Sequence, residues 1–149
     1  MPKAAPSPVV RHKKTMMFDG LTRSRLDDLS IKLDTHQTDV FRRAVVLMHA
    51  LILESEGRDA YLISQGGLRI KLDLDLGDNS DDAHKMTLKF NDETLRLVTE
   101  LSKHLKIFPT YVFRRAVAIF STLHTESANG QKVLLIDSIS GEVETLRFF

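Results

Sequence analysis

No cysteine occurs among the 149 residues of this chain. A disulfide framework and a thiolate metal site are therefore excluded. Long hydrophobic runs are absent as well, because the longest one, residues 44–53, is interrupted by His49 and is too short to cross a bilayer. The first residues lack the apolar core of a secretory signal. We therefore expect a soluble intracellular protein with a cytoplasmic location.

Catalytic patterns are missing too. We find no Ser-His-Asp set, no glycine-rich phosphate loop and no pair of catalytic carboxylates. The chain has six histidines, but no His-x3-His pair or carboxylate cluster accompanies them, as a zinc site would require. We predict that the chain is not an enzyme and has neither a metal site nor a cofactor.

Charge of one sign is not in large excess either. The net charge is +1 at pH 7, which by itself does not indicate a nucleic-acid partner. The charges are unevenly distributed, however, because five aspartates lie within residues 72–82 and basic residues collect before residue 26. This pattern fits a basic face with an acidic linker, or ordinary surface scatter with a solvated linker. The early basic residues are Lys3, Arg11, Lys13, Lys14, Arg23 and Arg25.

The most informative pattern that is present is an internal repeat. The hexapeptide VFRRAV occurs at residues 40–45 and again, 72 positions later, at residues 112–117. The correspondence extends back without a gap to His12 and His84. Each copy is small enough that folding alone would be marginal, so we expect the two copies to share one core. Matching positions include Thr15 and Thr87, Phe18 and Phe90, Ser30 and Ser102, and Thr38 and Thr110.

Each repeat begins with alternating apolar and polar residues, which is typical of a half-buried strand. Asp19 or Asn91 follows as a helix N-cap, and apolar residues at helical spacing predict two helices. Two apolar runs separated by a glycine-containing loop then predict a β-hairpin. The predicted strands are residues 13–18 and 85–90, and the predicted second helices are residues 38–54 and 110–126.

These elements divide the chain into four parts. Residues 1–11 are rich in Pro, Ala and Ser and are predicted to form a flexible arm. Residues 12–76 form the first repeat with its hairpin, residues 77–83 an acidic linker, and residues 84–149 the second repeat with its hairpin.

The order of strand, helix and helix, with VFRRAV in the second helix, resembles the ribbon-helix-helix DNA-binding family of the CopG, Arc and MetJ type. The resemblance covers residues 13–55 and 85–127, and the hairpins lie outside it. Members of that family are dimers in which one strand from each subunit joins an antiparallel ribbon that enters the DNA major groove. The resemblance implies an α+β fold, namely a tandem ribbon-helix-helix pseudo-dimer with a two-stranded antiparallel ribbon and four helices, each repeat followed by a β-hairpin.

The resemblance also implies which residues contact double-stranded DNA. The outward strand residues would read bases, because lysine donates to guanine, threonine donates, accepts or touches a thymine methyl, and methionine offers apolar contact. The alternative is that they are only the solvent face of the ribbon. The predicted base contacts are Lys13, Thr15, Met17, Lys85, Thr87 and Lys89, and the predicted phosphate contacts are Arg11, Lys14, Thr38, Lys106 and Thr110.

The chain departs from the family before the second helix, where members carry Gly-x-Ser/Thr and clamp a phosphate at the helix N-terminus. Residues 34–36 (Asp-Thr-His) and 106–108 (Lys-Ile-Phe) stand there without the glycine. Asp34 would repel a phosphate, whereas Lys106 would attract one. For the arginines of the two hexapeptides we favour an outer helix face with carboxylate partners over a phosphate role. These arginines are Arg42, Arg43, Arg114 and Arg115.

Two functions are consistent with these patterns. The first is sequence-specific binding of double-stranded DNA, as a transcriptional repressor or an architectural accessory factor on the nucleoid. The alternative is a protein–protein interaction module, like an antitoxin or a relaxosome accessory factor, with weak or no DNA specificity. The hairpins either pack on each other across a pseudo-twofold axis or mediate self-association or contact with another protein. No membrane partner is expected.

Overall fold

The computed structural model describes residues 12–54, 58–63, 66–67, 69–72, 84–128, 130, 132–137 and 139–145. The predicted arm with Arg11 and the predicted acidic linker lie outside these residues. The described residues have an α+β fold with four helices and two small antiparallel sheets. Among them, no helix has the length and apolar character needed to cross a membrane.

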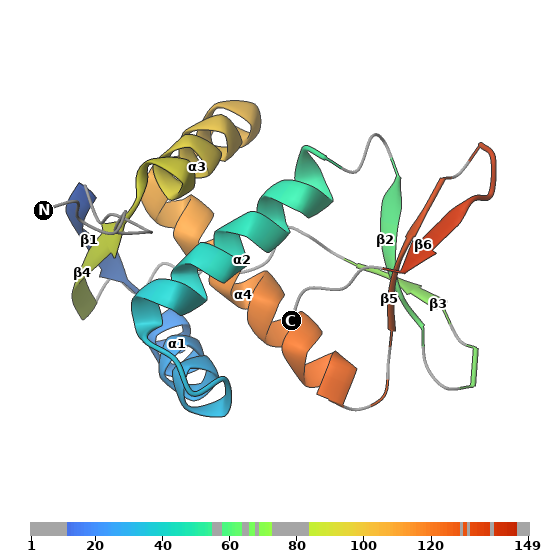
Figure 1. Cartoon of the computed structure of the whole chain (residues 1–149), viewed down its shortest axis with the longest axis horizontal. Helices are drawn as coiled ribbons and strands as arrows, with labels where there is room; N and C mark the ends of the chain where they lie inside the picture. The colour runs from blue at the N-terminus through green and yellow to red at the C-terminus, as the bar shows by residue number, and fades with distance from the viewer. Residues whose placement is uncertain are drawn as a thin grey trace, which may run out of the picture.

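The elements follow one another in the same order in both repeats. A two-stranded ribbon lies at one end of the molecule, four helices occupy the middle, and a four-stranded sheet lies at the other end (Figure 1). The first repeat contains β1 (His12–Phe18), α1 (Gly20–Lys32), α2 (Gln37–Ile52), β2 (Asp59–Ile63) and β3 (Arg69–Lys71), and the second contains β4 (His84–Phe90), α3 (Asp92–Leu105), α4 (Pro109–Ala128), β5 (Lys132–Ile136) and β6 (Val143–Thr145).

The ribbon joins the two repeats within one chain, as predicted. Strand β1 pairs antiparallel with β4, and Thr15 lies directly opposite its repeat mate Thr87. Because equivalent residues face each other at the centre, a local twofold axis relates the two strands. Each strand alone would leave a row of unpaired backbone groups and an uncovered apolar face, so neither repeat can complete this element by itself.

The first helices begin where the sequence predicts. Asn91 caps α3, and its side-chain oxygen accepts a hydrogen bond from the Thr94 amide at 2.9 Å. Asp19 occupies the same place before α1 but makes no side-chain bond to the backbone. It accepts a hydrogen bond from the Thr22 hydroxyl instead. The second helices differ from their predicted bounds by one or two residues at each end, a common uncertainty at helix termini.

Four phenylalanines form the centre of a core that both repeats share. Phe18 stacks on Phe41 with ring centroids 5.6 Å apart, Phe41 meets Phe113 edge-on at 5.3 Å, and Phe113 lies 5.8 Å from Phe90. Phe18 and Phe90 come from the ribbon, and Phe41 and Phe113 come from α2 and α4. All four are at least 93% buried. This chain of aromatic contacts supports the expectation of one core rather than two.

The hairpins also pair with each other. The sheet has the order β3-β2-β5-β6, and Tyr61 of β2 lies opposite Leu134 of β5. One face of this central pair is buried against the rest of the core through Ala60, Leu62, Val133 and Leu135. Of the two roles considered for the hairpins, packing on each other within the chain is therefore confirmed.

We expect the whole chain to unfold in one transition. Leu101 of α3 is fully buried in the shared core, so Leu101→Ala should lower the free energy of unfolding by about 2–5 kcal/mol while the protein still melts in a single step. Thermal melts followed by circular dichroism test this. Leu95→Ala on the same helix is the matched control, because Leu95 is 38% exposed. Two separate melting steps would contradict a shared core.

Candidate nucleic-acid interface

The outward face of the ribbon brings all six predicted base-contacting residues together. Alternation along β1 and β4 buries Met16, Phe18, Leu88 and Phe90 and leaves the intervening residues on the opposite face. In the observed register that face carries three cross-strand pairs, all exposed to solvent. They are Lys13 with Lys89, Thr15 with Thr87, and Met17 with Lys85.

The centre of this face is polar and its ends are charged. The hydroxyls of Thr15 and Thr87 lie 3.0 Å apart and form a hydrogen bond. Lys13 and Lys89 stand directly opposite each other, an arrangement that like charges disfavour in the absence of an anion. Within the described part of the chain, no carboxylate forms an ion pair with Lys13, Lys85 or Lys89. The face is therefore a positively charged surface without internal compensation.

The predicted phosphate-contacting residues are more scattered. Lys14 lies opposite Leu88 in the register, on the side that otherwise faces the core, yet its side chain is exposed. Thr38 is exposed in the first turn of α2, and Thr110 is half-buried in the first turn of α4. Lys106 is exposed and ends α3.

The turn between the two helices keeps a left-handed residue although glycine is absent. Asp34 (φ 49°) and its repeat mate Lys106 (φ 57°) both adopt this conformation, which is unfavourable for a residue with a Cβ atom. The following residues, Thr35 and Ile107, donate backbone hydrogen bonds to Ser30 and to Ser102 at 3.1 and 3.2 Å. The hydroxyls of the same two serines bond back to the Thr35 and Ile107 carbonyls. These bonds hold the turn in place of the glycine.

One end of the ribbon borders an open cleft of about 240 Å³. The cleft lies between the first turn of α2 and the junction of β4 with α3. It brings Thr38 close to Lys89, that is, a predicted phosphate contact close to a predicted base contact. Its lining consists of His36, Thr38, Asp39, Arg42, Lys89, Phe90, Asn91 and Thr94.

The arginines of the first hexapeptide lie on the outer helix face, as favoured. Arg42 and Arg43 both pair with Asp39, the second at 2.9 Å. Burial raises the pKa of the Asp39 carboxyl, but hydrogen bonds from Arg42 and Thr35 outweigh burial and hold that pKa below its ordinary value.

The prediction of an outer position is wrong for Arg114. This residue is 1% exposed, its guanidinium donates a 2.7 Å hydrogen bond to the Met17 carbonyl, and it lies 5.1 Å from the centroid of the Tyr111 ring. Asp19, which is equally buried, lies 3.9 Å away. A buried carboxylate attracts a buried cation, and the only sequence signal for this was that Asp19 occupies the position of the neutral Asn91.

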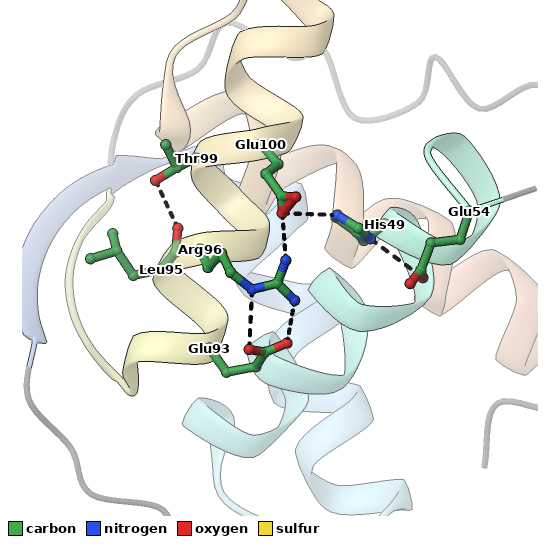
Figure 2. Close-up of polar contacts among 7 residues, drawn as sticks. All are labelled: His49, Glu54, Glu93, Leu95, Arg96, Thr99 and Glu100. Atoms are coloured by element: carbon green, nitrogen blue, oxygen red, sulfur yellow. Dashed lines mark hydrogen bonds and ion pairs between the residues drawn. The ribbon is translucent and has the colours of Figure 1, made fainter.

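A second charged cluster is not arranged as a metal site. His49 of α2 lies between two carboxylates, with Nδ1 3.3 Å from Glu54 and Nε2 3.4 Å from Glu100 (Figure 2). The two carboxylates contact opposite ring nitrogens, so they cannot bind one ion together with this ring. Arg96 bonds to both Glu100 and Glu93, and its hydrogen bond lowers the pKa of Glu93. The cluster joins α2 of the first repeat to α3 of the second.

No group of three or more histidines, cysteines, aspartates or glutamates among the described residues could hold a metal ion. Comparisons with family models, curated proteins and solved structures give no match to this chain. The geometry of the ribbon is therefore what any functional argument must use.

The left-handed turn makes a testable prediction about stability. Lys106→Gly removes the steric cost of a Cβ atom at positive φ, about 1–2 kcal/mol, and adds a smaller entropic cost in the unfolded chain. We expect the free energy of unfolding in urea to rise by roughly 0.5–1 kcal/mol. Lys103→Gly, in the last turn of α3, is the control and should lower it. Equal destabilisation by both changes would mean that residue 106 is not left-handed in solution.

Proposed function

We propose that this chain binds double-stranded DNA sequence-specifically, by inserting the β1–β4 ribbon into the major groove as a tandem ribbon-helix-helix pseudo-dimer. The observation that carries the proposal is the register of the ribbon, which gathers the six predicted base-contacting residues on one exposed face around the Thr15–Thr87 pair. A transcriptional repressor or an architectural accessory factor, acting on the nucleoid in the cytoplasm, fits such a surface.

The dimensions and chemistry of the ribbon support this proposal. A B-DNA major groove is about 12 Å wide and admits a two-stranded ribbon, and base edges there present distinct donors and acceptors. Lys13, Lys85 and Lys89 supply donors for guanine O6 and N7, and Met17 supplies an apolar surface for a thymine methyl. The central threonines can donate, accept or touch a methyl group. Arg11, Lys14, Thr38, Lys106 and Thr110 are the proposed phosphate contacts.

The two ends of the ribbon present different chemistry to DNA. One end carries Lys13 and Lys89, and the other carries Met17 and Lys85. A single chain should therefore prefer a site without twofold symmetry. A palindromic operator would require two chains bound side by side.

The alternative function is a protein-interaction module, and the four-stranded sheet favours it. Ile70 and Val143, on its two edge strands, are each 51% exposed. Tyr61 and Leu134 are only half-buried on the sheet face that points away from the core. This surface would serve a protein partner or a second copy of the chain. It lies at the opposite end of the molecule from the ribbon (Figure 1), so the two functions can be tested separately.

The decisive test replaces Lys85, Thr87 and Lys89 together by alanine. We expect specific DNA affinity to fall to the non-specific level, because half of the reading surface is removed. Lys89→Ala alone should cost roughly 1–3 kcal/mol at a cognate site and relax the preference at one base. Sites selected from random sequence, followed by titrations at several salt concentrations, provide the measurement, since each lost phosphate contact lowers the salt slope by about 0.9.

The matched control is the triple variant Lys71→Ala, Lys132→Ala and Thr145→Ala. It removes two lysines and a threonine that are exposed on the four-stranded sheet, so its change in net charge is the same. It should leave DNA affinity unchanged. If the ribbon variant binds as the wild type does at moderate salt, the ribbon is not the reading surface and the interaction module becomes the leading function.

A further inference from the structure

The two ends of the ribbon are built from equivalent positions yet differ in structure. The open cleft is lined by residues 36, 38, 39, 42, 89–91 and 94. Their repeat mates, 72 positions away, are residues 108, 110, 111, 114, 17–19 and 22. These mates surround the place where the Arg114 side chain is buried. One end is thus closed by an arginine, which we call the closed end, and the other is the open end.

Two substitutions between the repeats explain the difference. At the closed end, Asp19 draws Arg114 inward, and Tyr111 lies beside the guanidinium. At the open end, Asn91 replaces the carboxylate and therefore offers no charge to Arg42. Asp39 replaces the tyrosine and pairs with Arg42 on the surface of α2. The same arginine of the repeat therefore turns inward at one end and outward at the other.

The closed end is held more firmly. Arg114 bonds to the backbone carbonyl of Met17, which is itself a predicted base reader, and does so in a buried setting. Charge-assisted hydrogen bonds are about twice as strong as neutral ones, and low exposure protects them from screening by salt. The corresponding tie at the open end joins His12 to Asp92 at 2.7 Å, with side chains 32% and 68% exposed. Exposed pairs of this kind contribute little.

We propose that Arg114 is a positioning residue that fixes the Met17–Lys85 end of the ribbon, whereas the Lys13–Lys89 end adjusts to the DNA. This inference rests on the proposed function for its consequence, which is that bases under the closed end are discriminated more sharply than bases under the open end. The mechanism is preorganisation, because a reader held in place before binding loses less freedom on binding. The chain then recognises DNA with one strict half-site and one tolerant half-site.

The first experiment measures the two ends without DNA. Backbone amide exchange at Met17 and Lys85 is compared with exchange at Lys13 and Lys89, in the wild type and in Arg114→Met. We expect exchange at the closed end to accelerate by roughly tenfold or more, as the loss of one charge-assisted hydrogen bond predicts, with the open end unchanged. Arg42→Met, the repeat mate, is the control and should change neither end. Equal acceleration at both ends in Arg114→Met would overturn the inference.

The second experiment measures half-site discrimination. Each base of a selected site is replaced in turn, and the affinity ratio between the original and the replaced base is determined. Arg114→Met should reduce the ratios under the closed end by roughly tenfold and leave those under the open end as they were. A uniform loss across all positions would overturn the positioning role. If the wild type binds no DNA, the proposed function fails, and amide exchange alone decides whether Arg114 fixes the ribbon.

A third variant covers the case in which Arg114→Met does not fold. Asp39→Tyr combined with Asn91→Asp gives Arg42 the surroundings that Arg114 has. It should slow amide exchange at Lys13 and Lys89 by roughly tenfold and sharpen base discrimination there. Unchanged exchange at the open end would show that the buried arginine does not position the ribbon.

Discussion

The pairing of β1 with β4 is the constraint on which the rest of the structure depends. Each strand has one apolar face and would leave its backbone groups unpaired in isolation. Antiparallel pairing satisfies the backbone and turns both apolar faces to the same side. Phe18 and Phe90 then reach Phe41 and Phe113 on the second helices. The core therefore forms only when both repeats contribute, and the charged face of the ribbon is presented to solvent as a consequence.

The same twofold relation recurs at the far end of the molecule, where β2 pairs with β5. The outer strands of that sheet, β3 and β6, have three residues each, and short edge strands limit unwanted strand pairing. Between the two sheets the helices are also joined by the charges around His49, which link α2 to α3. Two surfaces at opposite ends, one basic and one partly apolar, are thus supported by a single core.

Divergence between the repeats has changed the surroundings of conserved positions more than the positions themselves. Arginine stands at 42 and at 114, but Asp39 and Tyr111 differ, and so do Asp19 and Asn91. A carboxylate one turn earlier on the same helix keeps Arg42 at the surface, whereas a carboxylate across the core brings Arg114 inside. In a dimer of identical chains both ends of the ribbon would be alike. A duplicated chain can make them different, which supports recognition of an asymmetric site.

The sequence by itself determined the repeat, the α+β class, the strand alternation, the two helices of each repeat and the hairpins, because periodicity and capping residues such as Asn91 are local signals. It also identified the outward residues of the ribbon, since alternation decides which side chains share a face. Only the tertiary structure decided that the hairpins pair with each other, that Arg114 is buried and that a cleft opens beside Lys89. Those features depend on which distant groups meet across the core, and a charge such as that of Asp19 carries no local mark of its partner 95 positions away.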